Sequence, residues 1–198
     1  MINYVSTRGM EGSFSAAEAI VKGIADDKGL FVPTKIPALS VSFDELAKMT
    51  YQQVAKLVIG SFFTSEEIDY CVDNAYDEKF EVPEIAKITK AGGANFLELY
   101  HGKTAAFKDM ALSILPYLMT TSMKKLGVDK KVCILTATSG DTGKAALEGF
   151  ADVENTEIIV FYPKDGVSEV QRRQMVTQEG KNVHVYAIEG NFDDAQTG

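Results

Sequence analysis

The chain has 198 residues, 45% of them hydrophobic, which is enough for one large domain or two small ones. Its formal charge is −8, from 20 basic and 28 acidic residues, and no basic run exceeds two residues, which argues against a nucleic-acid partner. The start lacks a secretory-signal pattern, and no apolar run reaches the roughly 20 residues that cross a bilayer. We therefore expect a soluble cytoplasmic protein without a membrane partner.

Cys71 and Cys133 are the only cysteines. Two cysteines so far apart form neither a disulfide framework nor a zinc cluster. We expect both to be small buried hydrophobic residues, and we predict no metal site.

Residues 1–80 carry repeated helix-start signals. Between the helices expected after the first two signals lies a short extended piece at 29–37 that contains two prolines. We therefore predict a mainly helical domain over 1–80, in which no residue indicates chemistry plainly. The signals are four capping boxes, each followed by apolar residues: Ser15-x-x-Glu18, Ser42-x-x-Glu45, Thr50-x-x-Gln53 and Thr64-x-x-Glu67.

Residues 81–198 are predicted to form a second, α/β region. It begins with two short strands, at 84–89 and 95–100, around a turn at 91–93. The stretch 105–127 then predicts a helix that ends at Gly127 and is buried in its first turns, since they are apolar on nearly every side. Pro116 should bend or split this helix.

From residue 131 the pattern alternates strand, helix, strand, helix and strand, and the second helix has its own capping box, Ser168-x-x-Gln171. The strands are apolar, which predicts a parallel sheet covered on both faces. In such sheets, ligands bind beyond the carboxyl ends of the strands, where the loop after Thr138 lies. Residues 190–196 resemble the first turn of another helix, so the three-stranded layer is expected to be incomplete, with an uncovered edge.

The loop Thr138-Ser139-Gly140-Asp141-Thr142-Gly143 is the first motif that can carry chemistry. Its small residues let a ligand approach the backbone, and the helix that follows offers N–H groups to an anion. A nucleotide P-loop fits poorly, because Thr138 replaces the first glycine and Ala145 replaces the hydroxyl that binds magnesium. Taken alone, the loop is equally consistent with a ligand site and with a simple turn.

The second motif is His101-Gly102-Lys103-Thr104-Ala105-Ala106-Phe107-Lys108-Asp109. Thr104 is a good N-cap, which predicts that Lys108 lies in the opening turns of a mostly apolar helix. Burial and the positive end of the helix dipole would both favour a neutral amine, the form that attacks a carbonyl to make a Schiff base. An ion pair with Asp109, or a lysine tip that reaches solvent, is the alternative.

Together and in this order, the two motifs resemble the threonine synthases, pyridoxal-phosphate (PLP) enzymes of the tryptophan-synthase β, or fold-type II, group. The shared patterns are HG-x-T-x-AFKD and ATSGDTG-x-AA, about 30 residues apart. The resemblance covers essentially the whole chain, because further segments match in order: Tyr4-x-Ser6-Thr7-Arg8-Gly9, Gly29-Leu30-Phe31-Val32-Pro33, Tyr162-Pro163 and Gly190-Asn191-Phe192-Asp193.

The resemblance implies a lyase that converts O-phospho-L-homoserine and water into L-threonine and phosphate. Lys108 is then the catalytic lysine that holds PLP as a Schiff base, and Phe107 and Asp141 lie at the cofactor. The substrate carboxylate is expected at Thr138, Ser139, Gly140 and Thr142. A bare Asp141 would repel that carboxylate, so its side chain should accept a hydrogen bond or point elsewhere.

The resemblance also implies that segments are missing. The family's loop for the cofactor phosphate, and the polar group that faces the pyridine nitrogen, come later in the sequence and do not occur before Gly198. We therefore expect the amino-terminal portion of the enzyme, which can be inactive alone. A phosphate- or nucleotide-binding module that uses the 139–143 loop is the other function considered. His101 is either near the site or structural, and the sequence does not define an oligomeric state.

Overall fold

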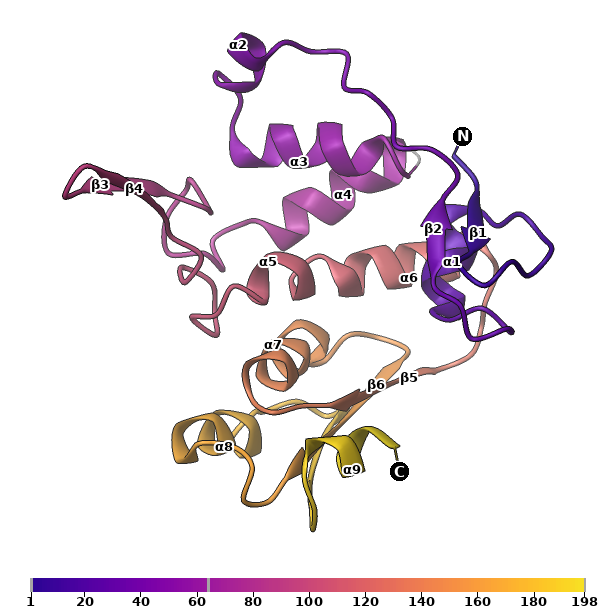
Figure 1. Ribbon diagram of the computed structural model, residues 1–198, viewed down its shortest axis with the longest axis vertical. Coiled ribbons are helices and arrows are strands. Elements are labelled where there is room, and N and C mark those ends of the chain that lie inside the picture. The colour runs from indigo at the N-terminus through magenta and orange to yellow at the C-terminus, as the bar shows by residue number, and fades with distance from the viewer. Residues whose placement is uncertain (1, 64, 198) are drawn as a thin grey trace. The chain divides into compact units, whose positions relative to one another are not determined.

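The computed structural model describes residues 2–63 and 65–197 (Figure 1). The chain forms two compact units, the first over Met1–Asp77 and Tyr117–Asp129 and the second over Glu78–Pro116 and Lys130–Gly198. The boundary predicted after residue 80 lies close to the first crossing between the units. The sequence did not indicate that 117–129 return to the first unit.

The first unit is mainly helical. Its helices are α1 (Ala16–Lys22), α2 (Phe43–Leu46), α3 (Tyr51–Gly60) and α4 (Ser65–Ala75). The capping boxes predicted for α1, α2 and α3 are confirmed, with both reciprocal hydrogen bonds present in each. Thr64 of the fourth predicted box lies outside the described residues. Two short strands, β1 (Tyr4–Ser6) and β2 (Phe31–Pro33), pair antiparallel beside the helices.

The two cysteines differ in their environment. Cys71 on α4 is fully buried, as predicted, and its Sγ lies 3.7 Å from Oγ1 of Thr121. Cys133 is exposed, so the prediction of burial is wrong for this residue. It alternates along its strand with inward-facing neighbours and therefore points to the open face of the sheet described below.

The second unit begins with a hairpin of β3 (Ile88–Ala91) and β4 (Ala94–Leu97). Its turn at Gly92 and Gly93 lies where it was predicted, but the first strand begins four residues later than expected. Ile85 has φ +60° and is buried, and this left-handed backbone cannot belong to a strand.

The helix predicted over 105–127 is divided into α5 (Asp109–Leu112) and α6 (Leu115–Lys125). The division expected at Pro116 is confirmed, but the start at Thr104 is wrong. Ala105 has φ +55°, outside the helical region, so the helix begins only after Lys108. The predicted end at Gly127 is confirmed: this residue has φ +64°, and the N–H of Val128 donates to the carbonyl of Met123 at 3.0 Å.

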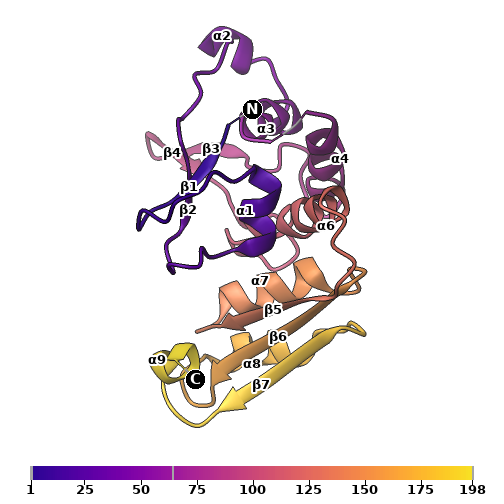
Figure 2. The same ribbon diagram turned by 90° about the vertical axis from the view of Figure 1, so that its right-hand side faces the viewer.

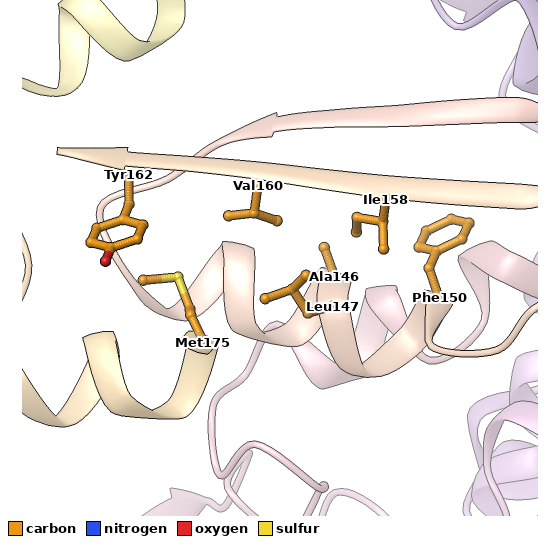
Figure 3. Close-up of a cluster of buried hydrophobic side chains, with 7 residues drawn as sticks. All are labelled: Ala146, Leu147, Phe150, Ile158, Val160, Tyr162 and Met175. Carbon is orange, nitrogen blue, oxygen red and sulfur yellow. The ribbon is translucent and has the colours of Figure 1, made fainter. Parts of the chain in front are cut away.

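The parallel sheet has the order β5-β6-β7, formed by β5 (Val132–Ala137), β6 (Thr156–Pro163) and β7 (Val183–Ile188) (Figure 2). The connecting helices are α7 (Asp141–Phe150) and α8 (Glu169–Val176), and α9 (Phe192–Thr197) follows β7. This is the α/β fold predicted from the alternating pattern. Both connecting helices cover one face of β6, as right-handed crossovers between consecutive strands require (Figure 3).

The core of the second unit lies between that face and the two helices. Its fully or nearly fully buried residues are Ala146, Leu147, Phe150, Ile158, Val160, Tyr162 and Met175 (Figure 3). The opposite face is more open: Leu135 and Tyr186 are 67% and 52% exposed, and α9 packs against β5 and β6. We predicted that helices cover both faces of the sheet. Within the described residues, helices cover one face fully and the other face only in part.

Candidate functional site

The turn between β5 and α7 is shaped by the side chain of Thr138. Its hydroxyl accepts hydrogen bonds from the N–H groups of Gly140 at 3.0 Å and Gly143 at 2.9 Å, and it donates to the carbonyl of Gly140 at 3.2 Å. A Cβ at Gly143 would lie 2.8 Å from the Cβ of Thr138, so only glycine fits there. Thr138 is buried, and its hydroxyl closes the turn from inside.

The outer side of the turn presents small polar groups. Ser139, Asp141 and Thr142 are exposed, and Gly140, the N-cap of α7, has φ +148° and offers no capping side chain. The first N–H groups of a helix lack intrahelical partners, and the helix dipole adds positive charge there. This end of α7 can therefore bind an anion through backbone N–H groups and two hydroxyls.

Asp141 is held by a residue from α8. The amide Nε2 of Gln171 donates to Oδ1 of Asp141 at 2.9 Å. The expectation that this carboxylate accepts a hydrogen bond therefore holds. The sequence indicates Gln171 only as the partner of Ser168 in a capping box, because a contact with a residue 30 positions away has no local signal.

Lys108 lies directly before α5, with helical backbone angles. Thr104 does not cap this helix; it donates its N–H to Oδ2 of Asp109 at 2.8 Å and its hydroxyl to Oδ1 at 2.6 Å. Asp109 is thereby occupied, and the alternative of an ion pair between it and Lys108 is wrong. Within the described residues Lys108 forms no ion pair, and its Nζ lies 4.7 Å from the ring centroid of exposed Phe107.

The segment before Lys108 is tightly constrained. A Cβ at Gly102 would lie 2.6 Å from the Cβ of Asp109, which explains the glycine of the HG motif. Ala105 adopts a left-handed conformation that costs a non-glycine residue free energy. The loop is thus held in one strained arrangement around the buried carboxylate of Asp109.

His101 anchors the loop to the end of the β3–β4 hairpin. Its buried ring places Nε2 2.7 Å from Oε2 of Glu98, and Nδ1 lies 3.7 Å from Oε2 of Glu81 without a hydrogen bond. The hydrogen bond with His101, and a second from Thr89, hold the pKa of Glu98 below its usual value. Of the two interpretations left open by the sequence, these contacts favour the structural one for His101.

The two motifs belong to the same compact unit. The helices that follow them, α5 and α7, pack together; Gly149 on α7 leaves room only for the carbonyl of Leu112 on α5. A half-buried lysine that forms no ion pair within residues 2–63 and 65–197, and a turn with open N–H groups, are the groups that an aldehyde cofactor and an anionic substrate require. The residues present therefore fit a PLP-type ligand.

Comparisons of sequence and of structure both find that the chain is similar to threonine synthases. Residues 3–76 match the family described as "Threonine synthase N terminus". The chain is 39% identical to threonine synthase of Pseudomonas aeruginosa over 98% of its own length and 42% of the relative's. It is 35% identical to human threonine synthase-like 2, with coverages of 96% and 40%.

Solved structures match equally well. The PLP-bound threonine synthase of Brucella melitensis superposes with a TM-score of 0.86 at 35% identity, over 99% of this chain and 43% of that one. The yeast threonine synthase gives 0.87 at 30% identity, over 98% and 42%. The chain thus spans about two fifths of the length of these relatives.

The parallel sheet and its connecting helices place the chain with the α/β proteins. More particularly, the chain is similar to the amino-terminal part of the threonine synthases. Within the described residues, no helix is long and apolar enough to cross a membrane.

Proposed function

We propose that the full-length protein is a PLP-dependent threonine synthase, a carbon–oxygen lyase that converts O-phospho-L-homoserine and water into L-threonine and phosphate. The likeness to threonine synthases over nearly the whole chain supports this assignment. The environment of Lys108 is the observation that best supports the assignment. The amine of this lysine in the AFKD motif forms no ion pair among the described residues, because the neighbouring carboxylate accepts hydrogen bonds from Thr104.

Lys108 is proposed to carry the cofactor covalently and to move protons during turnover. PLP, when bound, supplies an electron sink for charge that develops on the substrate. Phosphate leaves from Cγ and water adds at Cβ, so protons must move at Cα, Cβ and Cγ. One tethered amine near all three carbons gains from proximity and acts as acid and base in turn.

The 138–143 turn is proposed to bind the substrate carboxylate. Ser139 and Thr142 offer hydroxyls and N–H groups at the start of α7, and Gly140 lies between them in the turn with its own N–H bonded to Thr138. Thr138 contributes indirectly, because its buried hydroxyl accepts hydrogen bonds from two N–H groups of the turn and so fixes the conformation of the turn. Asp141 faces the cofactor in this proposal, and the exposed ring of Phe107 lies beside the Lys108 amine.

Titration of PLP into the full-length protein tests the assignment. A visible absorption band should form that Lys108→Ala abolishes and that Lys130→Ala keeps, because Lys130 is an exposed lysine outside both motifs. Phosphate release from O-phospho-L-homoserine should follow the same order. An unchanged band in Lys108→Ala would reject the role of this lysine, and no turnover by the cofactor-loaded protein would reject the substrate.

Comparison of related amino acids tests the substrate assignment. The human relative carries the name threonine synthase-like 2, so sequence likeness alone does not fix the reaction. Assays should therefore compare O-phospho-L-homoserine with O-phospho-L-serine and L-serine. The proposal predicts turnover of the first alone.

The 198-residue chain provides a second comparison. The family's loop for the cofactor phosphate is expected outside it, so we propose that this chain binds PLP weakly and turns over no substrate. Turnover by the 198-residue form at the rate of the full-length protein would contradict this.

Nucleotide binding by the 140–143 turn is the alternative function, and the geometry disfavours it. A P-loop lysine must reach the phosphates, but Lys144 pairs with Glu148 at 3.2 Å and also contacts the side chain of Gln178. Thermal stabilisation by ATP and magnesium, without stabilisation by PLP, would reverse this preference.

A further inference from the structure

Gln171 on α8 contacts the 138–143 turn at two points. Its Nε2 donates to Oδ1 of Asp141 at 2.9 Å. Its amide group also packs over Gly140, where an added Cβ would lie 2.8 Å from Oε1 of Gln171. The φ of +148° favours glycine at 140, and a Cβ at this position would also displace the Gln171 amide.

The other end of the same amide is fixed as well. Oε1 of Gln171 accepts from the N–H of Ser168 at 3.3 Å and from its hydroxyl at 3.1 Å, as the second half of the α8 capping box. The amide thus has one orientation that satisfies both ends, with oxygen toward Ser168 and nitrogen toward Asp141. The start of α8 holds the start of α7 through one side chain.

The two oxygens of the Asp141 carboxylate therefore differ in their hydrogen bonding. Oδ1 is occupied by Gln171, and Oδ2 has no hydrogen bond among the described residues. Without a fixed donor, a charged carboxylate at the helix start would compete with an anionic ligand for the same N–H groups. With the donor in place, Oδ2 is left as a single acceptor that a ligand hydroxyl or other donor can meet.

We propose that Gln171 is a positioning residue that fixes Asp141 and the 138–143 turn for ligand binding. The effect on the turn is a property of this chain alone, whereas the effect on the ligand rests on the proposed function. The ligand group expected at Oδ2 is a hydrogen-bond donor, and anionic groups are expected only at the N–H groups and hydroxyls of the turn.

Gln171→Glu separates this role from helix capping. Glutamate serves as well as glutamine at this position of a capping box, but it cannot donate to Asp141 and places a like charge beside it. In the full-length protein without cofactor, hydrogen exchange of the 138–143 amides should rise about three- to ten-fold, the equivalent of one lost hydrogen bond. Thr177→Ala is the matched control, because it removes a hydrogen bond at the other end of α8, keeps Gln171 and Ser168 in place, and should leave exchange of the turn within about two-fold.

A reversed pair tests the contact itself. In Asp141→Asn combined with Gln171→Glu, the new amide donates to the new carboxylate, so exchange of the turn should return toward the original rate. Exchange that stays unchanged in Gln171→Glu, or a double variant as fast as the single one, would overturn the positioning role.

PLP affinity provides the ligand readout. Gln171→Glu should weaken binding about three- to ten-fold, by the same lost bond. If the turn loosens and affinity is unchanged, the ligand part of the inference is overturned. If the unmodified full-length protein binds no PLP, the proposed function fails, while the exchange data still decide the role of Gln171.

Discussion

Thr104 and Asp109 form a closed pair, in which the N–H and the hydroxyl of the threonine both donate to the buried carboxylate. The pair encloses residues 105–108 and engages the carboxylate of the residue that follows Lys108 in the sequence. Thr104, which resembles a helix cap in the sequence, therefore fixes the loop instead. The amine of Lys108 is left without an ion pair among the described residues.

Thr104→Val should destabilise the protein by about 1–3 kcal/mol, since it leaves a buried carboxylate oxygen without its donor. Urea unfolding measures the change. Thr177→Val is the control, because its hydroxyl bonds a carbonyl on an exposed helix end, and it should cost no more than about 0.5 kcal/mol. Equal losses in the two variants would show that the Thr104–Asp109 pair is unimportant.

Lys108→Met should leave the free energy of unfolding within about 0.5 kcal/mol of the original, because the amine contributes no ion pair among the described residues. PLP binding should be lost in the same variant. A loss of stability above about 1.5 kcal/mol would instead assign Lys108 a structural role.

Thr138→Val should cost about 1–3 kcal/mol, because two N–H groups and one carbonyl of the turn lose their partner. Thr138→Ser keeps the hydroxyl and should retain most of the stability and the affinity for the substrate carboxylate. If valine weakened substrate binding without loosening the turn in hydrogen exchange, Thr138 would be a direct contact instead.

Acid sensitivity should depend on Glu98. Its pKa is lowered chiefly by the hydrogen bond with His101, so its contribution to stability is present above the unfolded pKa of about 4.3 and is lost as pH falls through the lower folded value. Urea midpoints at about pH 6 and about pH 3 should differ less in Glu98→Gln than in the original protein. Parallel pH profiles would contradict this.

Much of the fold follows from local chemistry. The boxes that begin at Ser15, Ser42, Thr50 and Ser168 cap helices as predicted, because the bonds join residues three apart. The order β5-β6-β7 follows from apolar strands that alternate with helices.

The departures arise where a distant or unusual contact outweighs a local signal. Thr104 has a good capping side chain, but Asp109 takes both of its donors and Ala105 turns into the left-handed region. Gln171 carries no mark of its contact with Asp141, since the two belong to different helices. Both motifs of the candidate site were found from the sequence, but the hydrogen bonds that hold them in place were not.

Reduction with borohydride followed by peptide mapping is the most direct test of the central claim. Treatment of the PLP-loaded full-length protein fixes the cofactor to the amine that carries it. We predict one modified lysine, Lys108, in the peptide that contains Phe107 and Asp109. Modification of another lysine in place of Lys108, or of none, would contradict the account.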